Sequence, residues 1–149
     1  MAYSFEVCHA FGDVFLSDDK KGCALLLLPE QKRLTPRSVL WNIGLIRSAV
    51  GLGNLKKVVE RESKIRKLHP KEPIYYLWFI GVDPDAQHAG TGTGLLREVI
   101  GKSKEINRPV YLETSVPQNL YWYEKMGFEI YNELNFGYRL FFLKLCQHR

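Results

Sequence analysis

The feature that most constrains this chain is a glycine-rich loop, Gln87 to Gly94, that joins two segments of different pattern. Before it, Ile74 to Val82 is almost continuously apolar, which predicts a strand buried on both faces. After it, apolar residues recur at helical spacing from Leu95 to Ile100. Glycines let a backbone approach a ligand closely, and the unpaired amides of a helix N-terminus favour negative charge. Strand, loop and helix together predict a phosphate cradle.

Two common phosphate-binding motifs do not fit this loop. A Walker loop ends in Gly-Lys-Ser/Thr, whereas Gly94 is followed here by Leu95. A dinucleotide fingerprint has the spacing G-x-G-x-x-G, whereas this loop has G-x-G-x-G and no acidic residue at the expected place beyond it. Taken alone, the glycines also suit a tight strand-to-helix turn that binds nothing.

The remaining pattern predicts one α/β or α+β domain with a mixed sheet. Asp13–Ser17 and Gly22–Leu28 read as a β-hairpin around a polar turn. One helix is expected from Thr35 to about Val50 and a second from Asn54, with a break at Gly51-Leu52-Gly53. The later elements are expected to be a strand at Val110–Thr114, a helix at Pro117–Lys125 ended by a left-handed Gly127, and strands at Glu129–Leu134 and Tyr138–Leu145.

Composition excludes several classes of protein. The longest apolar run, Ala24 to Leu28, falls far short of the roughly 18 residues that span a bilayer, and the start does not resemble a signal peptide, so we expect a cytoplasmic protein without a membrane segment. The three cysteines are too far apart for a zinc site, so no metal is expected. The net charge of +5 would suit a nucleic-acid surface, an anionic ligand or simply a solvated helix face, and no nucleic-acid motif accompanies it.

The loop with its flanks resembles the pyrophosphate-binding motif of the GNAT superfamily of N-acetyltransferases. The lead-in is Gly81-Val82-Asp83-Pro84-Asp85, and the loop reads Gln-x-x-Gly-x-Gly. Farther on, Leu112-Glu113-Thr114-Ser115, Pro117-x-Asn119-Leu120 and Tyr123 to Phe128 are similar to the closing region of the same superfamily, most of all to the branch with puromycin N-acetyltransferase. The resemblance covers about residues 70–145.

This resemblance implies a fold and a division of the chain. The fold is a GNAT-type mixed, mostly antiparallel central sheet, flanked by helices, with a splayed central strand pair. Residues 1–149 form a single domain, with 74–134 as the acetyl-CoA-binding core and 35–70 as a helical insertion beside the acceptor. Members usually begin with a further strand and one or two helices that have no counterpart here, so a homodimer that covers an exposed edge is also expected.

The resemblance also implies an activity, the acetyl-CoA-dependent transfer of an acetyl group to a primary amine within a ternary complex. Tyr123 matches the general acid that protonates the leaving thiolate, although it could instead be one of three packed aromatics. Glu113 is the candidate base acting through water, and a salt-bridged strand-end carboxylate is the alternative. The implied acetyl-CoA contacts are Ile80, Gly81, Val82, Gln87, His88, Ala89, Gly90, Thr91, Gly92, Thr93, Asn119 and Tyr123.

One departure from the family pattern keeps a second function open. The third place of the loop is commonly Arg or Lys in the family, and this chain has Ala89 there. One charge–phosphate contact is therefore missing, and His88 or Lys125 is the candidate substitute. A non-catalytic acyl-CoA-binding module is the alternative to an enzyme, and a basic nucleic-acid-binding protein is a third hypothesis.

Overall fold

The computed structural model describes residues 2–31 and 51–146, which divide into two compact units. One unit combines residues 1–29 with 73–149, and the other comprises residues 30–72. The described elements are α1 (Ala2–Phe11), β1 (Gly12–Leu16), β2 (Gly22–Leu27), the 3-10 turn η1 (Pro29–Gln31), α3 (Gly51–Leu68), β3 (Tyr75–Val82), η2 (Pro84–Ala86), α4 (Thr91–Glu105), β4 (Val110–Thr114), η3 (Pro117–Asn119), α5 (Leu120–Lys125), β5 (Phe128–Asn135) and β6 (Arg139–Leu145).

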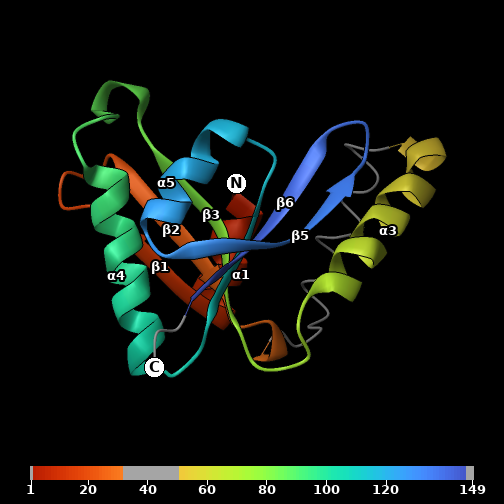
Figure 1. The fold of residues 1–149 in the computed structure, drawn as a ribbon, viewed down its shortest axis with the longest axis horizontal. Helices are drawn as coiled ribbons and strands as arrows, with labels where there is room; N and C mark the ends of the chain where they lie inside the picture. Colours follow the sequence, from red (N-terminus) through yellow and green to blue (C-terminus); the bar gives the residue numbers. More distant parts are fainter. Residues whose placement is uncertain (1, 32–50, 147–149) are drawn as a thin grey trace. The chain divides into compact units, whose positions relative to one another are not determined.

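The larger unit is built on one six-stranded sheet with the strand order β1-β2-β3-β4-β6-β5 (Figure 1). All neighbouring strands pair antiparallel except β3 and β4, which run parallel. The connection between these two strands carries α4, as a parallel crossover requires. The expected mixed, mostly antiparallel sheet flanked by helices is therefore confirmed.

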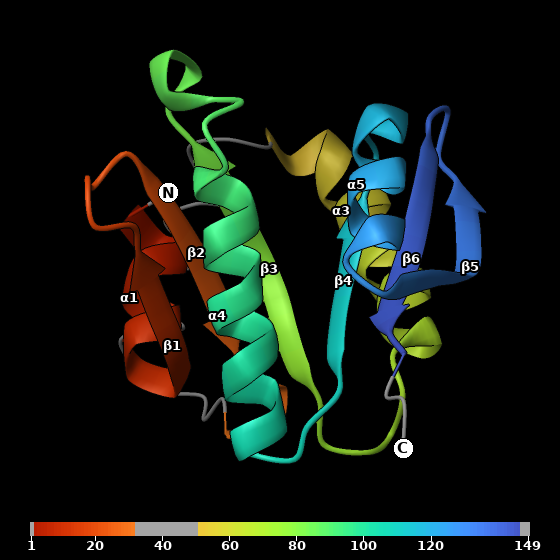
Figure 2. The ribbon, with the colours of Figure 1, turned by 60° about the vertical axis from the view of Figure 1, so that its left-hand side comes forward.

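The central pair β3 and β4 is splayed. The two strands pair only at Tyr75 and Tyr76, which face Val110 and Tyr111, so β4 forms no ladder with residues 77–82. On its other side β3 keeps its pairing with β2 but contains a bulge at Trp78. A bulge bends its strand and increases the local twist, which turns β3 away from β4. Figure 2 shows the two strands meeting at one end and diverging toward the end that carries η2 and α5.

Helices cover both faces of this sheet. The amphipathic α4 buries Leu95, Leu96 and Val99, and Leu96 and Val99 join the main core with residues of β2, β3, β4 and β6. Figure 2 shows α4 lying along the sheet over β2 and β3. On the opposite face, Val7 and Cys8 of α1 pack in a smaller cluster with alternate residues of β2. The main core, on the α4 side, is the layer that positions the site described below.

Three sequence expectations need correction. The strand predicted as buried on both faces is buried only at its first half, because residues 78–82 lose β4 as a neighbour and are only half-buried. The helix expected to begin at Asn54 begins at Gly51 instead, so the glycines at 51 and 53 lie within α3, since glycine lowers helix propensity without forbidding a helix. The segment predicted as one helix over 117–125 is η3 followed by the shorter α5.

Most other expectations agree with the structure. β4 has the predicted bounds, the two hairpins lie within a residue or two of theirs, and Gly127 follows α5 with a φ of 91°. The helix expected from Thr35 to Val50 lies outside the described residues. Within residues 2–31 and 51–146, none of the helices combines the length and hydropathy required to cross a bilayer. The same described ranges contain no group of His, Cys, Asp and Glu side chains arranged to hold a metal ion.

Candidate functional site

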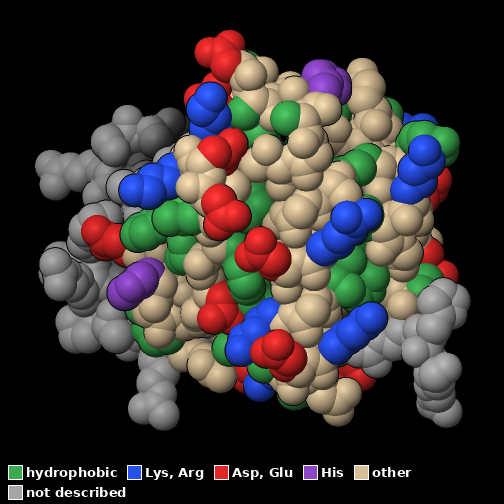
Figure 3. All heavy atoms as spheres, turned by 90° about the vertical axis from the view of Figure 1, so that its left-hand side faces the viewer, with side chains coloured by type: hydrophobic (Ala, Val, Ile, Leu, Met, Phe, Trp, Pro, Cys, Tyr) green, Lys and Arg blue, Asp and Glu red, His purple; other side chains and the backbone are tan. Residues whose placement is uncertain are grey.

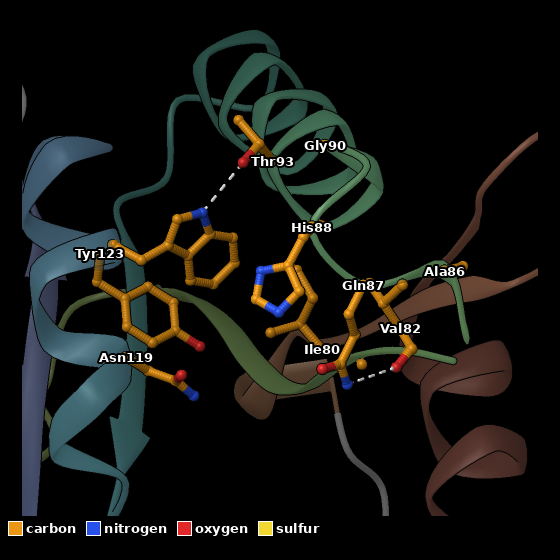
Figure 4. A pocket seen from close by; sticks show the side chains of 12 residues that line it. Ile80, Val82, Ala86, Gln87, His88, Gly90, Thr93, Asn119 and Tyr123 are labelled. Carbon is orange, nitrogen blue, oxygen red and sulfur yellow. Dashed lines mark hydrogen bonds between the residues drawn. The ribbon is translucent and has the colours of Figure 1, made fainter. Parts of the chain in front are cut away.

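A cleft of about 540 Å³ opens where β3 and β4 diverge. One wall comes from the end of β3, η2 and the start of α4, and the other comes from η3 and α5. Figure 4 shows the side chains of these two walls facing each other across the opening. The lining residues are Ile80, Gly81, Val82, Ala86, Gln87, His88, Gly90, Gly92, Thr93, Asn119, Trp122 and Tyr123.

The backbone of β3 turns hydrogen-bonding groups toward this cleft. Asp83 donates its N–H to the carbonyl of Lys21 at 2.7 Å, so its backbone faces the β2 side. Because successive residues of a strand point their backbone groups to opposite sides, Gly81 also faces β2, whereas Val82 and Ile80 face the splayed side. No β4 residue pairs with them there. The splay thus leaves an extended backbone edge along the cleft.

The loop between β3 and α4 is held by local contacts. Asp83 caps η2, because its Oδ1 accepts the N–H of Asp85 at 3.0 Å, and Pro84 begins the turn. Gln87 donates its Nε2–H to the carbonyl of Val82 at 3.3 Å, which ties the loop back to the strand end. The Val-Asp-Pro-Asp-x-Gln lead-in therefore fixes the direction from which the loop reaches the helix.

The first turn of α4 presents unpaired amides beside the cleft. Gly90 is the N-cap with a φ of 86°, a conformation that glycine adopts without strain. The amide of Gly94 donates to the carbonyl of Gly90 at 2.9 Å and makes the first bond of the helix, so the amides of the three residues between them have no intrahelical acceptor. Unpaired amides and the positive end of the helix dipole are chemically suited to hold an anion.

The opposite wall carries a buried tyrosine. Tyr123 of α5 is only 5% exposed, and Figure 4 shows its hydroxyl directed into the cleft beside the amide of Asn119. Burial raises the pKa of Tyr123 to about 12, so the phenol stays protonated at neutral pH. Its ring packs against Phe128 at 5.7 Å between centroids, and Gly127 ends α5 with its N–H bonded to the carbonyl of Glu124. The phenol is therefore held in a fixed position with its O–H protonated in the cleft.

Charge outside the cleft does not form one basic field on the side of the molecule that carries α4. In Figure 3 the Lys and Arg side chains on that side are interspersed with Asp and Glu. α4 itself pairs Lys102 with Glu105 at 3.2 Å. The basic residues that dominate the net charge lie on α3, in the smaller unit. Nothing on the α4 side favours a nucleic-acid surface over a site for a small anion.

Residues 48–130 match the acetyltransferase (GNAT) domain family. This match spans more than half of the chain. The chain belongs to the GNAT acetyltransferase family. Its GNAT fold is also found in solved structures, although their sequences have diverged so far that the likeness concerns the fold alone.

Three of these structures share most of this chain's fold. Mosquito arylalkylamine N-acetyltransferase like 5b is 15% identical over 96% of this chain and 78% of its own, with a TM-score of 0.63. Arabidopsis thaliana Naa50, in complex with the bisubstrate analogue CoA-Ac-MVNAL, is 14% identical over 98% and 81%, with a TM-score of 0.61. A Corynebacterium glutamicum histone acetyltransferase HPA2 and related acetyltransferase is 20% identical over 90% of this chain, with a TM-score of 0.55. The present chain spans 63% of that protein's length.

The GNAT domain brings nearly all of the sequence-predicted acetyl-CoA contacts to the cleft. Ala89 and Thr91 alone among them line a neighbouring pocket of about 380 Å³ instead, beside the turn between β1 and β2. Ala86 and Trp122 line the cleft but were not predicted as contacts. For Trp122 a signal was available, because the indole directly precedes the predicted general acid. His88 projects into the cleft from a left-handed residue with a φ of 65°.

Glu113 is not brought to the cleft. Side chains alternate along β4, and Leu112 lies in the core under α4 and α5, so Glu113 lies on the opposite face of the GNAT sheet. There the hydroxyl of Tyr76 donates a hydrogen bond to Oε2 of Glu113. The pKa of the nearby Tyr131 is raised, mainly by burial and further by the charge of Glu113. The carboxylate is thus set among tyrosines, across the sheet from Tyr123.

Proposed function

We propose that this GNAT domain transfers the acetyl group of acetyl-CoA directly to a primary amine, without an acetylated enzyme intermediate. The observation that carries the proposal is the cleft, because it joins three groups with complementary tasks. These are the amides at the start of α4, the splayed edge of β3 and the protonated Tyr123. The similarly folded Naa50, solved in complex with the bisubstrate analogue CoA-Ac-MVNAL, supports the proposal of a ternary complex.

The two halves of the cleft divide the work of binding. The amides of Thr91, Gly92 and Thr93 would hold the pyrophosphate of the substrate at the positive end of the α4 dipole. The outward backbone groups of Ile80 and the N–H of Val82 would pair with the pantetheine arm, as an added strand pairs with a sheet edge, while the Val82 carbonyl keeps its bond from Gln87. Both interactions use the backbone, so they do not depend on the side chain missing at Ala89.

The chemistry requires one bond to form, one to break and two protons to move. Acetyl-CoA supplies the thioester carbonyl. The amine nitrogen forms the new C–N bond, and a backbone N–H near Ile80 stabilises the oxygen of the attacked carbonyl. As the C–S bond breaks, Tyr123 donates its proton to the sulfur and later regains one from solvent. The attacking amine gives its proton to water, and the proposed acceptor beyond that water is Glu113, which lies outside the cleft on the opposite face, just past the end of the β3–β4 ladder.

Several expectations belong to this proposal as well. The domain extends over residues 1–149, with 74–134 as the substrate-binding core and 35–70 as a helical insertion. The protein works in the cytoplasm without a metal, and a homodimer would cover an open sheet edge. Within the family, the chain is proposed to stand nearest the branch that includes puromycin N-acetyltransferase, and its acceptor is an amine on a small molecule or a peptide. Fold alone names no acceptor, so the amine has to be found by experiment.

The first test is a thermal melt of the full chain with acetyl-CoA. A ligand that binds only the folded protein raises the melting temperature by mass action. We expect a concentration-dependent increase with acetyl-CoA and a smaller one with adenosine monophosphate, which lacks the pyrophosphate and the pantetheine arm. An unchanged melting temperature at millimolar acetyl-CoA would overturn the proposal.

The second test separates an enzyme from a non-catalytic acyl-CoA-binding module. Release of free CoA thiol is followed across a panel of small primary amines and peptides with free N-termini. We expect release that depends on one class of amine and a product heavier by one acetyl group. Binding of acetyl-CoA without release on any amine would favour the binding module.

A further inference from the structure

One hydrogen bond crosses the cleft and joins its two walls. Trp122 of α5 donates its indole Nε1–H to Oγ1 of Thr93 in the first turn of α4, at 3.1 Å (Figure 4). Both residues line the cleft. The bond lies at the open end of the splay, where the β3–β4 ladder has already ended. It therefore bridges two halves of the sheet that do not pair there.

The chemistry of the two groups fixes the direction of this bond. An indole N–H can only donate, so the oxygen of Thr93 must be the acceptor. The hydroxyl hydrogen of Thr93 is then left for another acceptor. Among the residues that the structure describes, Thr93 makes no other side-chain hydrogen bond. Its hydroxyl thus has a donor available at the lining of the cleft, next to the unpaired amides of the same helical turn.

The indole that holds the hydroxyl is itself fixed by packing. Its ring contacts the ring of Tyr123 at 4.8 Å between centroids, tilted by 49°. On the α4 side it lies next to Gly92, where an added Cβ would be in ordinary van der Waals contact with the indole at 3.7 Å and with Val82 at 3.4 Å. Trp122 is half-buried and packs on the main core. The direction of its N–H is consequently set by the fold.

We infer that Trp122 is a positioning residue, which holds the Thr93 hydroxyl so that its proton points into the cleft as a donor to the substrate's pyrophosphate. This inference rests on the proposed function. The amides of α4 and the Thr93 hydroxyl then converge on one anion. The chain lacks the Arg or Lys that would supply charge at Ala89, and the oriented hydroxyl supplies a side-chain donor in the same cradle.

The test compares two ligands that differ in the pyrophosphate. Dissociation constants are measured by calorimetry for acetyl-CoA and for S-acetyl-pantetheine, which lacks the pyrophosphate and nucleotide. We expect Thr93→Val to weaken acetyl-CoA binding about tenfold, the usual worth of a hydrogen bond to a charged group. Trp122→Phe should weaken it in the same direction. Neither change should alter binding of S-acetyl-pantetheine, and Thr93→Ser should restore acetyl-CoA binding.

Controls separate this role from simple packing. Ser63→Ala removes an exposed hydroxyl of α3 that does not line the cleft and should leave both dissociation constants unchanged. In the unmodified protein, the Trp122 indole N–H resonance should shift when acetyl-CoA is added and stay in place with S-acetyl-pantetheine. This measurement decides the question even where Trp122→Phe does not fold.

Three outcomes would overturn the inference. In the first, Trp122→Phe weakens the binding of acetyl-CoA and of S-acetyl-pantetheine equally, and the indole resonance of the unmodified protein does not shift with acetyl-CoA. In the second, the Thr93→Val protein binds acetyl-CoA with an unchanged dissociation constant. In both cases the unmodified protein still binds acetyl-CoA, so the proposed function survives. The third is an unmodified protein that does not bind acetyl-CoA at all, which overturns the proposed function too.

Discussion

The substitution Tyr123→Phe removes one oxygen from the cleft, and we expect it to lower catalysis without much effect on the stability of the fold. The ring of Tyr123 would keep its contacts with Phe128 and Trp122, at 5.7 and 4.8 Å between centroids. Within the described residues the hydroxyl has no hydrogen-bond partner that the change would orphan. The stability cost is therefore expected to stay below about 1 kcal/mol, or roughly 4 °C in melting temperature for a chain of this size.

The catalytic cost should be much larger. A positioned general acid contributes about 10²- to 10⁴-fold to the rate, so we expect kcat to fall by at least about a hundredfold. The KM for acetyl-CoA should change little, because the backbone contacts on the opposite wall remain. Burial raises the pKa of Tyr123 to about 12, so its hydroxyl stays protonated over the range of the assay. The kcat of the unmodified enzyme should therefore not fall through deprotonation of Tyr123 below about pH 11.

The assay is steady-state thiol release from pH 6 to 10, with circular dichroism melts of both proteins. A Tyr123→Phe protein that retains kcat within a factor of three and an unchanged pH profile would refute the role of the phenol. A parallel loss of kcat, affinity and melting temperature would refute it as well, because the side chain would then be mainly structural.

Two further predictions concern stability. Burial raises the pKa of Tyr75, Tyr123 and Tyr131 above the ordinary value of 10.0. Each therefore contributes stability that is complete below pH 10 and declines as pH rises through its folded-state pKa. For Tyr123 the loss reaches about 2 kcal/mol by pH 12, and a urea midpoint that stays level from pH 9 to 11.5 would contradict this. Gly12→Ala should lower the free energy of unfolding by more than about 3 kcal/mol, because its Cβ would lie 1.9 Å from the Leu26 carbonyl oxygen. The Cβ of Gly101→Ala in α4 would meet nothing within 4 Å, so this variant should gain up to about 1 kcal/mol, both values being measured by urea titration. Equal midpoints for these two variants would contradict the described β1–β2 packing.

Local sequence patterns predicted where the helices and strands lie better than they predicted how buried those elements are. The strand Val110–Thr114 and the left-handed Gly127 that follows α5 were placed correctly, because strand propensity and a helix cap are properties of a few neighbouring residues. The half-exposure of residues 78–82 was not predicted, since it follows from the divergence of β4, a strand that lies about 30 residues later in the chain. Burial depends on tertiary neighbours, which a short stretch of sequence does not specify.

The site shows the same division. The motif from Gln87 to Gly92 predicted which backbone lies at the cleft, because strand, loop and helix start are contiguous in sequence. It did not predict that Glu113 lies across the sheet from Tyr123, because alternation assigns alternate faces without telling which face the cleft occupies. Nor could it predict the bond from Trp122 to Thr93, which joins two helices on either side of the splay.

The most direct test of the central claim is an NMR titration of the ¹⁵N-labelled full chain with acetyl-CoA. The claim is that the start of α4 and the splayed edge of β3 bind this substrate together. We predict saturable shifts that are largest at the amides of Thr91, Gly92 and Thr93, with a second set at Ile80 and Val82, while the turn between β5 and β6 stays unchanged. Absence of saturable shifts, or shifts confined to the α1 face of the sheet, would contradict the account.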